Sequence, residues 1–239
     1  VIDVNEAPTI DDVTTNLPEN LIHPFMVEKL VAKDPDTKTA FTQNVFTMLE
    51  GDTSIFRLVS DGELWAKKTF DYETDQKTYT IKVLVQDKNN PSLKDSAIVT
   101  VNITNSNDGP KFDTHDTTFY VDENKPFKDS VKATDQDGDK ITYSIVGTVP
   151  FEIDSTGVIT SNRTFDYEKE KGFTFKVVAD DGKAKDTMTV NIKVTDVNEP
   201  VHTKDTTFVV DEGKTGEIGK VKGEDEDGKP VKFSCDDTV

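Results

Sequence analysis

Several segments of the chain alternate strictly between apolar and polar residues. In one of them the apolar positions are Met188, Val190, Ile192 and Val194, and polar residues stand between them. Because a β-strand points successive side chains to opposite faces, this spacing predicts a strand with one buried and one solvated face. No segment sustains the period of about 3.6 residues that marks an amphipathic helix. The alternation therefore predicts an all-β protein.

The alternating segments form matched pairs in two successive stretches of the chain. The apolar positions of the other segments are Tyr79, Ile81, Val83, Val85, Ala97, Val99, Val101, Ile103, Phe173, Phe175, Val177 and Ala179. Short strands with one wet face favour an antiparallel β-sandwich. A unit of about 100 residues buries enough apolar surface to fold without disulfides, and the single cysteine, Cys235, cannot form one within the chain.

Four short motifs recur in the same order at a period of roughly 90 to 100 residues, which indicates a tandem repeat. The recurring segments are 69–73 and 164–168; 116–123 and 205–212; 3–6, 105–108 and 196–199; and 34–36, 135–137 and 225–227. We expect an internal piece of a longer protein, and the motifs divide it into four parts. These are the tail of a preceding linker (1–7), two complete repeats (8–108 and 109–199) and a truncated third repeat (200–239).

The chain is strongly acidic, with 28 basic and 46 acidic residues and a formal charge of −18. This balance argues against a nucleic-acid partner, because such binding depends on Lys and Arg neutralising phosphates, and equally against docking on anionic lipid. No apolar run approaches the roughly 18 residues of a membrane-spanning helix. The acidic excess leaves two interpretations open, a solvated surface or carboxylates gathered around cations.

The positions of the acidic residues favour cations. Asp87 and Asp181 continue the inward parity of their strands, two residues after Val85 and Ala179, so each strand leaves the core and enters a polar end of its unit. Further acidic residues fall at the same ends, namely Asp36, Asp108, Asp137, Glu199 and Asp227. Oxygen ligands without His or Cys suit Ca²⁺, which takes six to eight of them in flexible geometry.

Taken together, these motifs make the chain resemble the cadherin extracellular repeat over essentially its whole length. The motifs that carry the resemblance are Pro18-Glu19-Asn20, Asp34-Pro35-Asp36, Asp71-Tyr72-Glu73, Gln86-Asp87 and the linker Asn105-Ser106-Asn107-Asp108-Gly109-Pro110. The resemblance implies tandem seven-stranded antiparallel Greek-key β-sandwiches, similar to the immunoglobulin fold and joined end to end by calcium-binding linkers. It also implies up to three Ca²⁺ ions at each internal junction.

The resemblance further implies which residues bind the metal. At the first junction they are Glu19, Asp71, Glu73, Asn105, Ser106, Asn107, Asp108, Gly109, Asp135, Asp137 and Asp181, with Ser106 and Gly109 acting through their carbonyls. At the second they are Glu123, Asp166, Glu168, Asp196, Val197, Asn198, Glu199, Asp225 and Asp227. A half junction at the start of the chain comprises Asn5, Asp34, Asp36 and Asp87.

Three departures from the family pattern bear on these sites. Asn105 stands where the family usually has an aspartate, so the first junction loses one formal charge and some affinity. Glu6 and Glu199 replace the usual linker aspartate with a longer acid. The linkers also reach Pro110 and Pro200 over less chain than the common form.

Other kinds of site fit the acidic motifs less well. Residues 135–139 resemble the start of an EF-hand loop, but Gly138 falls fourth rather than sixth, and Val146 occupies the place of the closing glutamate. The pair Asp71 and Glu73 recurs in both repeats, whereas a glycosidase uses one pair of carboxylates across a single substrate. No Ser/His/Asp or Cys/His arrangement is evident, so we do not expect an enzyme.

The function expected from the resemblance is calcium-dependent cell–cell adhesion or extracellular linkage, with another cadherin-like ectodomain as the homophilic or heterophilic partner. The location would be the cell surface, as part of a single-pass membrane protein. An alternative remains open, in which the repeats serve as a spacer, stalk or ligand-binding module of a surface receptor or a bacterial adhesin. The glycosylation sequons at Asn102 and Asn162 are compatible with either role.

Overall fold

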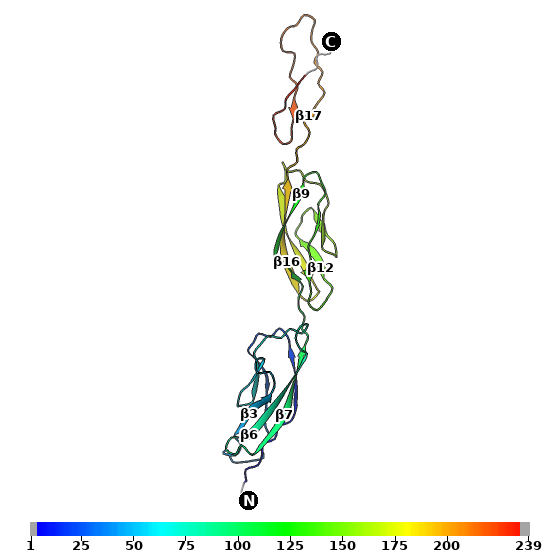
Figure 1. The fold of residues 1–239 in the computed structure, drawn as a ribbon. Helices are drawn as coiled ribbons and strands as arrows, with labels where there is room; N and C mark the ends of the chain where they lie inside the picture. Colours follow the sequence, from blue (N-terminus) through cyan, green and yellow to red (C-terminus); the bar gives the residue numbers. More distant parts are fainter. Residues whose placement is uncertain (1–3, 235–239) are drawn as a thin grey trace. The chain divides into compact units, whose positions relative to one another are not determined.

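A computed structural model describes residues 4–234 and divides the chain into two compact units, Val1–Asn107 and Asp108–Val239. All regular elements within residues 4–234 are β-strands (Figure 1). The all-β prediction is therefore confirmed. Cys235 lies outside the described residues.

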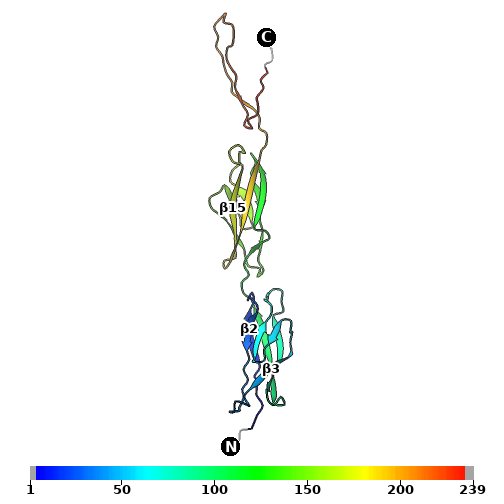
Figure 2. The same cartoon turned by 90° about the vertical axis from the view of Figure 1, so that its left-hand side faces the viewer.

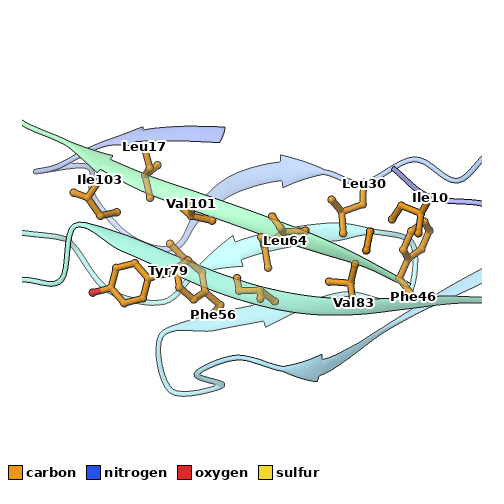
Figure 3. Packing of buried hydrophobic residues seen from close by; sticks show 14 of the residues in the cluster. Ile10, Leu17, Leu30, Phe46, Phe56, Leu64, Tyr79, Val83, Val101 and Ile103 are labelled. Carbon is orange, nitrogen blue, oxygen red and sulfur yellow. The ribbon is translucent and has the colours of Figure 1, made fainter. Parts of the chain in front are cut away.

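The first unit is a sandwich of two sheets, with strand orders β1-β7-β6-β3 and β2-β5-β4 (Figure 1 and Figure 2). Its strands are β1 (Val13–Pro18), β2 (Phe25–Lys29), β3 (Asn44–Glu50), β4 (Phe56–Leu58), β5 (Glu63–Ala66), β6 (Thr78–Asp87) and β7 (Lys94–Thr104). Figure 3 shows apolar side chains of both sheets meeting between them, among them Leu64, Val83 and Val101.

The second unit repeats this arrangement, with sheets ordered β12-β15-β16-β9 and β10-β14-β13 and two short pairs, β11-β8 and β17-β18. Its strands are β8 (Lys111–Phe112), β9 (Asp116–Asp122), β10 (Lys128–Ser130), β11 (Ala133–Thr134), β12 (Thr142–Val146), β13 (Phe151–Ile153), β14 (Val158–Ser161), β15 (Gly172–Asp180), β16 (Lys185–Thr195), β17 (His202–Thr203) and β18 (Gly223–Glu224).

The alternation expected from the sequence is present in the long strands. In β16 the four apolar positions from Met188 to Val194 are all buried, and β7 buries its equivalents from Ala97 to Ile103. One strand of each sandwich pairs in parallel, β1 with β7 and β9 with β16, whereas the other long pairs are antiparallel. The hydrophobic period reports which face of a strand is buried and carries no information about the direction of its neighbour.

Buried apolar residues stand directly before the acidic motifs and anchor them. Phe70 and Phe165 are 3% and 1% exposed and immediately precede Asp71 and Asp166. Phe165 packs against Phe151 with ring centroids 5.4 Å apart. Because these rings are fixed in a close-packed core, the acidic residues that follow them project from a rigid base.

Equivalent glycines close the hairpin β4–β5 and the hairpin β13–β14. Gly62 and Gly157 have φ angles of +95° and +85°, and their carbonyls accept the N–H groups of Leu30 and Val131 at 2.8 and 2.9 Å. A Cβ atom at Gly62 would lie 2.5 Å from the Leu30 carbonyl oxygen, and one at Gly157 would lie 2.2 Å from that of Val131. Glycine is therefore required here both for its backbone conformation and for the close approach of the next sheet edge.

We expect Gly157→Ala to destabilise the second unit more than Gly147→Ala does. Both glycines have positive φ, but nothing lies within 4 Å of a Cβ added at Gly147. The matched pair thus separates conformational strain, which both variants share, from the steric clash at Gly157, which adds about 1–3 kcal/mol. Urea denaturation followed by circular dichroism measures the difference, and equal losses would contradict the close approach.

Candidate metal centre

Each unit contains a buried glutamate that accepts two backbone N–H groups. The Glu19 carboxylate is 2% exposed and accepts the N–H of Ser106 at Oε1 (2.9 Å) and the N–H of Tyr72 at Oε2. The Glu123 carboxylate, also 2% exposed, accepts the N–H of Val197 at Oε1 and of Tyr167 at Oε2, both at 2.8 Å. Each glutamate therefore ties the acidic loop after the buried phenylalanine to the segment after the last strand.

These ties bring further carboxylates together. In the first unit the carboxylates of Glu19 and Glu73 have oxygen atoms within 4.8 Å of each other. In the second unit three groups of three oxygens meet the same limit; one comes from residues 135–139, and Glu168 belongs to both of the other two. We call the residues of these two groups the second cluster: Glu123, Glu168, Asp196, Glu199 and Asp227. Like charges at this separation repel, and a cation between them would remove the repulsion.

The second aspartate of each Asp-x-Asp motif accepts a backbone N–H from the acidic linker residue that precedes its repeat. The three bonds are Glu6 to Asp36 (3.0 Å), Asp108 to Asp137 (2.7 Å) and Glu199 to Asp227 (3.3 Å). In every case the accepting atom is Oδ2. The same backbone contact thus fixes the motif beside its linker three times along the chain.

Several oxygens of this set are buried and accept no hydrogen bond from residues 4–234. They include Oδ1 of Asp36, Oδ2 of Asp87, Oδ2 of Asp135, Oε2 of Glu199 and Oδ1 of Asp227. A buried carboxylate oxygen without a donor carries an uncompensated desolvation cost, unless a cation coordinates it. The donor set is made of oxygens alone, so the residues fit a hard cation such as Ca²⁺.

The residues expected at the first half junction lie near one another without forming a tight group. Asp34 accepts the Asp36 N–H (3.1 Å) and the Asn44 amide (3.2 Å), and the Asn5 amide group lies 3.2 Å from Asp36 Oδ2. Asp87 is fully buried at the end of β6. Within residues 4–234, no three carboxylates at this end have oxygens within 4.8 Å of one another.

Other expected ligands sit in loops and are held by local hydrogen bonds. Asp71 Oδ1 accepts the Thr74 N–H (3.1 Å), and Asp181 Oδ1 accepts the N–H groups of Lys183 and Ala184 (both 2.6 Å). Asp225 Oδ1 accepts the Lys229 N–H (3.2 Å). The remaining linker residues are exposed or half-buried, namely Asn105, Ser106, Asn107, Gly109, Val197 and Asn198. The structure places neither Asp181 nor Asp225 in a close group of carboxylates among the described residues.

Two candidate oxygen ligands were missed by sequence reasoning. Asp139 joins Asp135 and Asp137, and oxygens of these three residues lie within 4.8 Å of one another; we call them the Asp triad. The alternate spacing of three aspartates was a usable signal for it. Asn44 is the first residue of β3 and pairs in register with Asp87, and its Oδ1 is buried without a partner among the described residues. Because this proximity depends on strand register, no local signal reveals it.

Lysines enter the second cluster and its surroundings. Lys169 Nζ forms an ion pair with Asp166 Oδ2, and this hydrogen bond lowers the pKa of Asp166 and raises that of Lys169. Lys229 Nζ lies 3.0 Å from Asp227 Oδ2, lowers the pKa of Asp227 in the same way, and also contacts Asn198 Oδ1. Part of the negative charge is therefore already balanced by ammonium groups.

Two glutamates of the second cluster have raised pKa values, in contrast to these two aspartates. Desolvation raises the pKa of Glu168, and the nearby charges of Glu123 and Asp196 add to the effect. Desolvation likewise raises the pKa of Glu199, assisted by Glu123, Asp227 and Glu168. The pKa values of the aspartates are thus lowered and those of the glutamates raised within one small region, as expected where charges are crowded together.

The chain belongs to the cadherin family. The family model described as "Cadherin domain" matches residues 14–104 and 117–195. Human protocadherin-11 X-linked is 34% identical over 199 residues, covering 78% of this chain, and cadherin-87A of Drosophila melanogaster is 32% identical over 234 residues, covering 86%. The chain spans only 15% and 12% of the length of these relatives.

Solved cadherin structures share the fold. The EC22-24 fragment of mouse cadherin-23 has a TM-score of 0.62 at 24% identity and covers 92% of this chain and 78% of its own. Drosophila N-cadherin EC1-4 has a TM-score of 0.57 at 23% identity and covers 80% of this chain and 50% of its own. The prediction of tandem cadherin-like sandwiches is thus confirmed. Within the described residues, no helix has the length and apolar character needed to cross a membrane.

We expect Glu123→Ala to destabilise the second unit by about 2–5 kcal/mol in a buffer containing EDTA, because two backbone N–H groups lose a charged acceptor. Urea denaturation provides the measurement. Glu152→Ala, which removes an exposed glutamate of the same unit, serves as the matched control and should change stability little. If both variants behave alike, Glu123 does not hold the two segments together.

We also expect Glu199 to titrate above the ordinary glutamate pKa and Asp227 below the ordinary aspartate pKa in the metal-free protein. Because folding raises the pKa of Glu199, its contribution to stability falls as pH rises from the ordinary value through the raised one, and stays lower above it. Side-chain carboxyl chemical shifts measured by NMR across the acidic range provide the test. A Glu199 midpoint at or below the ordinary value would refute the crowding of charge at this site.

Proposed function

We propose that the chain is a segment of a calcium-dependent cell-adhesion ectodomain, in which Ca²⁺ bound at the ends of the repeats rigidifies the connection between them. One observation supports this proposal above the others. In the second cluster, a buried glutamate already bonded to two backbone N–H groups stands among four further acidic residues, and the buried oxygens Glu199 Oε2 and Asp227 Oδ1 have no donor among the described residues.

The proposed ligands are the residues that the family resemblance implies, divided among the linker tail 1–7 and the repeats 8–108, 109–199 and 200–239, with Asn44 and Asp139 added. Within the second cluster, the buried Glu123, and Glu168 of the acidic loop, would hold the ion from the end of the second repeat. Asp196 and Glu199 of the linker and Asp227 of the following motif would complete the ligand set. Calcium accepts such mixed carboxylate, amide and carbonyl sets. Up to three ions per internal junction are part of the proposal.

The mechanism is mechanical and electrostatic. Without a cation, crowded carboxylates repel one another and the exposed linker residues restrain the chain weakly. A divalent ion coordinated by residues of a repeat end and of the linker would attract the carboxylates of both segments and so hold them together. Extracellular modules typically bind calcium with Kd values of about 10⁻⁴ to 10⁻³ M, so extracellular calcium would hold the segment in its stiff state.

The relatives support the cellular setting of the proposal. Protocadherins and cadherins are among the proteins most similar to this chain, and cadherin domains generally bind calcium. We propose a cell-surface location and another cadherin-like ectodomain as the partner. The repeats would supply reach and orientation, while the exposed faces of the sandwiches would determine which partner is bound.

Calcium should raise the melting temperature of the chain in differential scanning fluorimetry, relative to the same buffer with EGTA. At a calcium concentration ten times Kd, each site contributes about 1.4 kcal/mol of stabilisation. Glu168→Gln should lose part of this shift, because it removes a charge shared by both groups of the second cluster. Glu152→Gln, an exposed substitution in the same unit, should retain all of it.

The same samples separate stiffening from adhesion. Small-angle scattering should give a narrower distribution of particle dimensions in calcium than in EGTA, and identical profiles and melting temperatures would refute the calcium proposal. Sedimentation velocity in calcium then tests self-association: a concentration-dependent increase supports homophilic adhesion by this segment. A strict monomer assigns the segment to a spacer role or to a heterophilic partner.

A further inference from the structure

The Asp-x-Asp motif of the third repeat differs from that of the second at one neighbouring position. In the second repeat the motif Asp135 and Asp137 is followed by Asp139, which completes the Asp triad. In the third repeat the equivalent position after Asp225 and Asp227 is Lys229. The first repeat carries Lys38 at this position, so the same point of the repeat holds a carboxylate in the second repeat and an ammonium in the first and third.

Lys229 is directed toward the acidic cluster and not toward solvent alone. Its Nζ lies 3.0 Å from Asp227 Oδ2 and contacts Asn198 Oδ1, so it bridges the motif and the linker. The Asp227 side chain is only 3% exposed, and its other oxygen, Oδ1, is buried without a partner among the described residues. One oxygen of this carboxylate is therefore committed to an ammonium, and the other remains available to a cation.

The lysine beside the Asp triad makes a different contact. Lys183 Nζ pairs with Asp139, the third member of the triad, at 2.8 Å. Asp135 Oδ2 stays buried without a partner in the described part of the chain. Lys183 thus balances an extra carboxylate, whereas Lys229 takes the place of that carboxylate and bonds the aspartate next to the linker.

A second lysine pairs with Asp166, an expected ligand two residues before Glu168 of the second cluster. Lys169 Nζ forms this pair, and Asp166 itself follows the buried Phe165. The equivalent residue of the first repeat, three positions after Asp71, is Thr74, which carries no charge. Both positions are therefore lysine at the second cluster, whereas the first repeat combines Lys38 with Thr74 and the second repeat has Asp139 at the first of them.

We propose that Lys229 and Lys169 are built-in counter-ions of the second cluster, which neutralise part of its charge and so lower the number of calcium ions it binds and their affinity. This inference rests on the proposed calcium binding. The ammonium groups occupy oxygens that a cation would otherwise coordinate, and their charge repels a divalent ion. The two ends of repeat 109–199 would consequently bind calcium at different calcium concentrations.

Isothermal titration calorimetry of the full chain with calcium chloride tests this inference. Lys229→Asp, which restores the residue found in the Asp triad, should increase the stoichiometry by about one ion per chain. Lys229→Gln and Lys169→Thr should each tighten the weakest binding step roughly tenfold, equivalent to about 1.4 kcal/mol. Lys214→Asp is the matched control, because it makes the same charge change at an exposed residue of the same repeat segment; it should alter neither quantity.

The melting temperature in EDTA gives a readout independent of bound calcium. If the lysines balance charge in the metal-free protein, Lys229→Gln should lower this temperature and Lys214→Gln should not. Unchanged stoichiometry and affinity in all lysine variants, with calcium binding by the parent intact, would overturn the counter-ion role. A parent chain without any heat of binding at millimolar calcium would instead overturn the proposed function, so the two failures are distinguishable.

Discussion

The structure of each repeat end depends on one interaction, the buried glutamate carboxylate that accepts two backbone N–H groups. Glu19 and Glu123 each connect a loop that begins at a buried phenylalanine with the segment that follows the last strand. A charge so deeply buried is tolerated because hydrogen-bond donors surround it. The same anchorage forces other acidic residues into proximity, so the element that orders the repeat end also concentrates its negative charge.

The rigid sandwich core keeps these acidic residues close together despite their mutual repulsion. Packed rings such as Phe151 and Phe165 fix the strands, and glycines such as Gly157 let the hairpins approach the end of the neighbouring strand. Close-packed interiors resist small displacements, so the carboxylates at the repeat end cannot relax apart by deforming the strands. The remaining routes to relief are neutralisation by protons, by ammonium groups or by metal ions. Desolvation raises the pKa of Glu199, which favours the first route, and the hydrogen bond from Lys229 lowers the pKa of Asp227, which reflects the second.

Much of this arrangement was predictable from the sequence, because strand period and repetition are local properties. The inward parity of Asp87 placed a carboxylate at the buried end of a strand, and the structure buries it fully. Features that depend on neighbouring strands were not predictable. The parallel pairing of β1 with β7 and the register that sets Asn44 beside Asp87 arise from tertiary pairing, on which the hydrophobic period is silent.

The family motif predicts which acidic residues form the site, but it does not predict the lysines that change the charge of the site. A motif match identifies Asp225 and Asp227 as equivalents of Asp135 and Asp137, and it treats the following position as variable. In space that position reaches the linker, because the turn after the motif folds back on it, as the Lys229 contact with Asn198 demonstrates. One substitution at a variable position therefore changes the sign of the charge inside the site. Repeats with nearly identical motifs can consequently differ in the net charge at their ends, and the number of acidic residues alone does not give that charge.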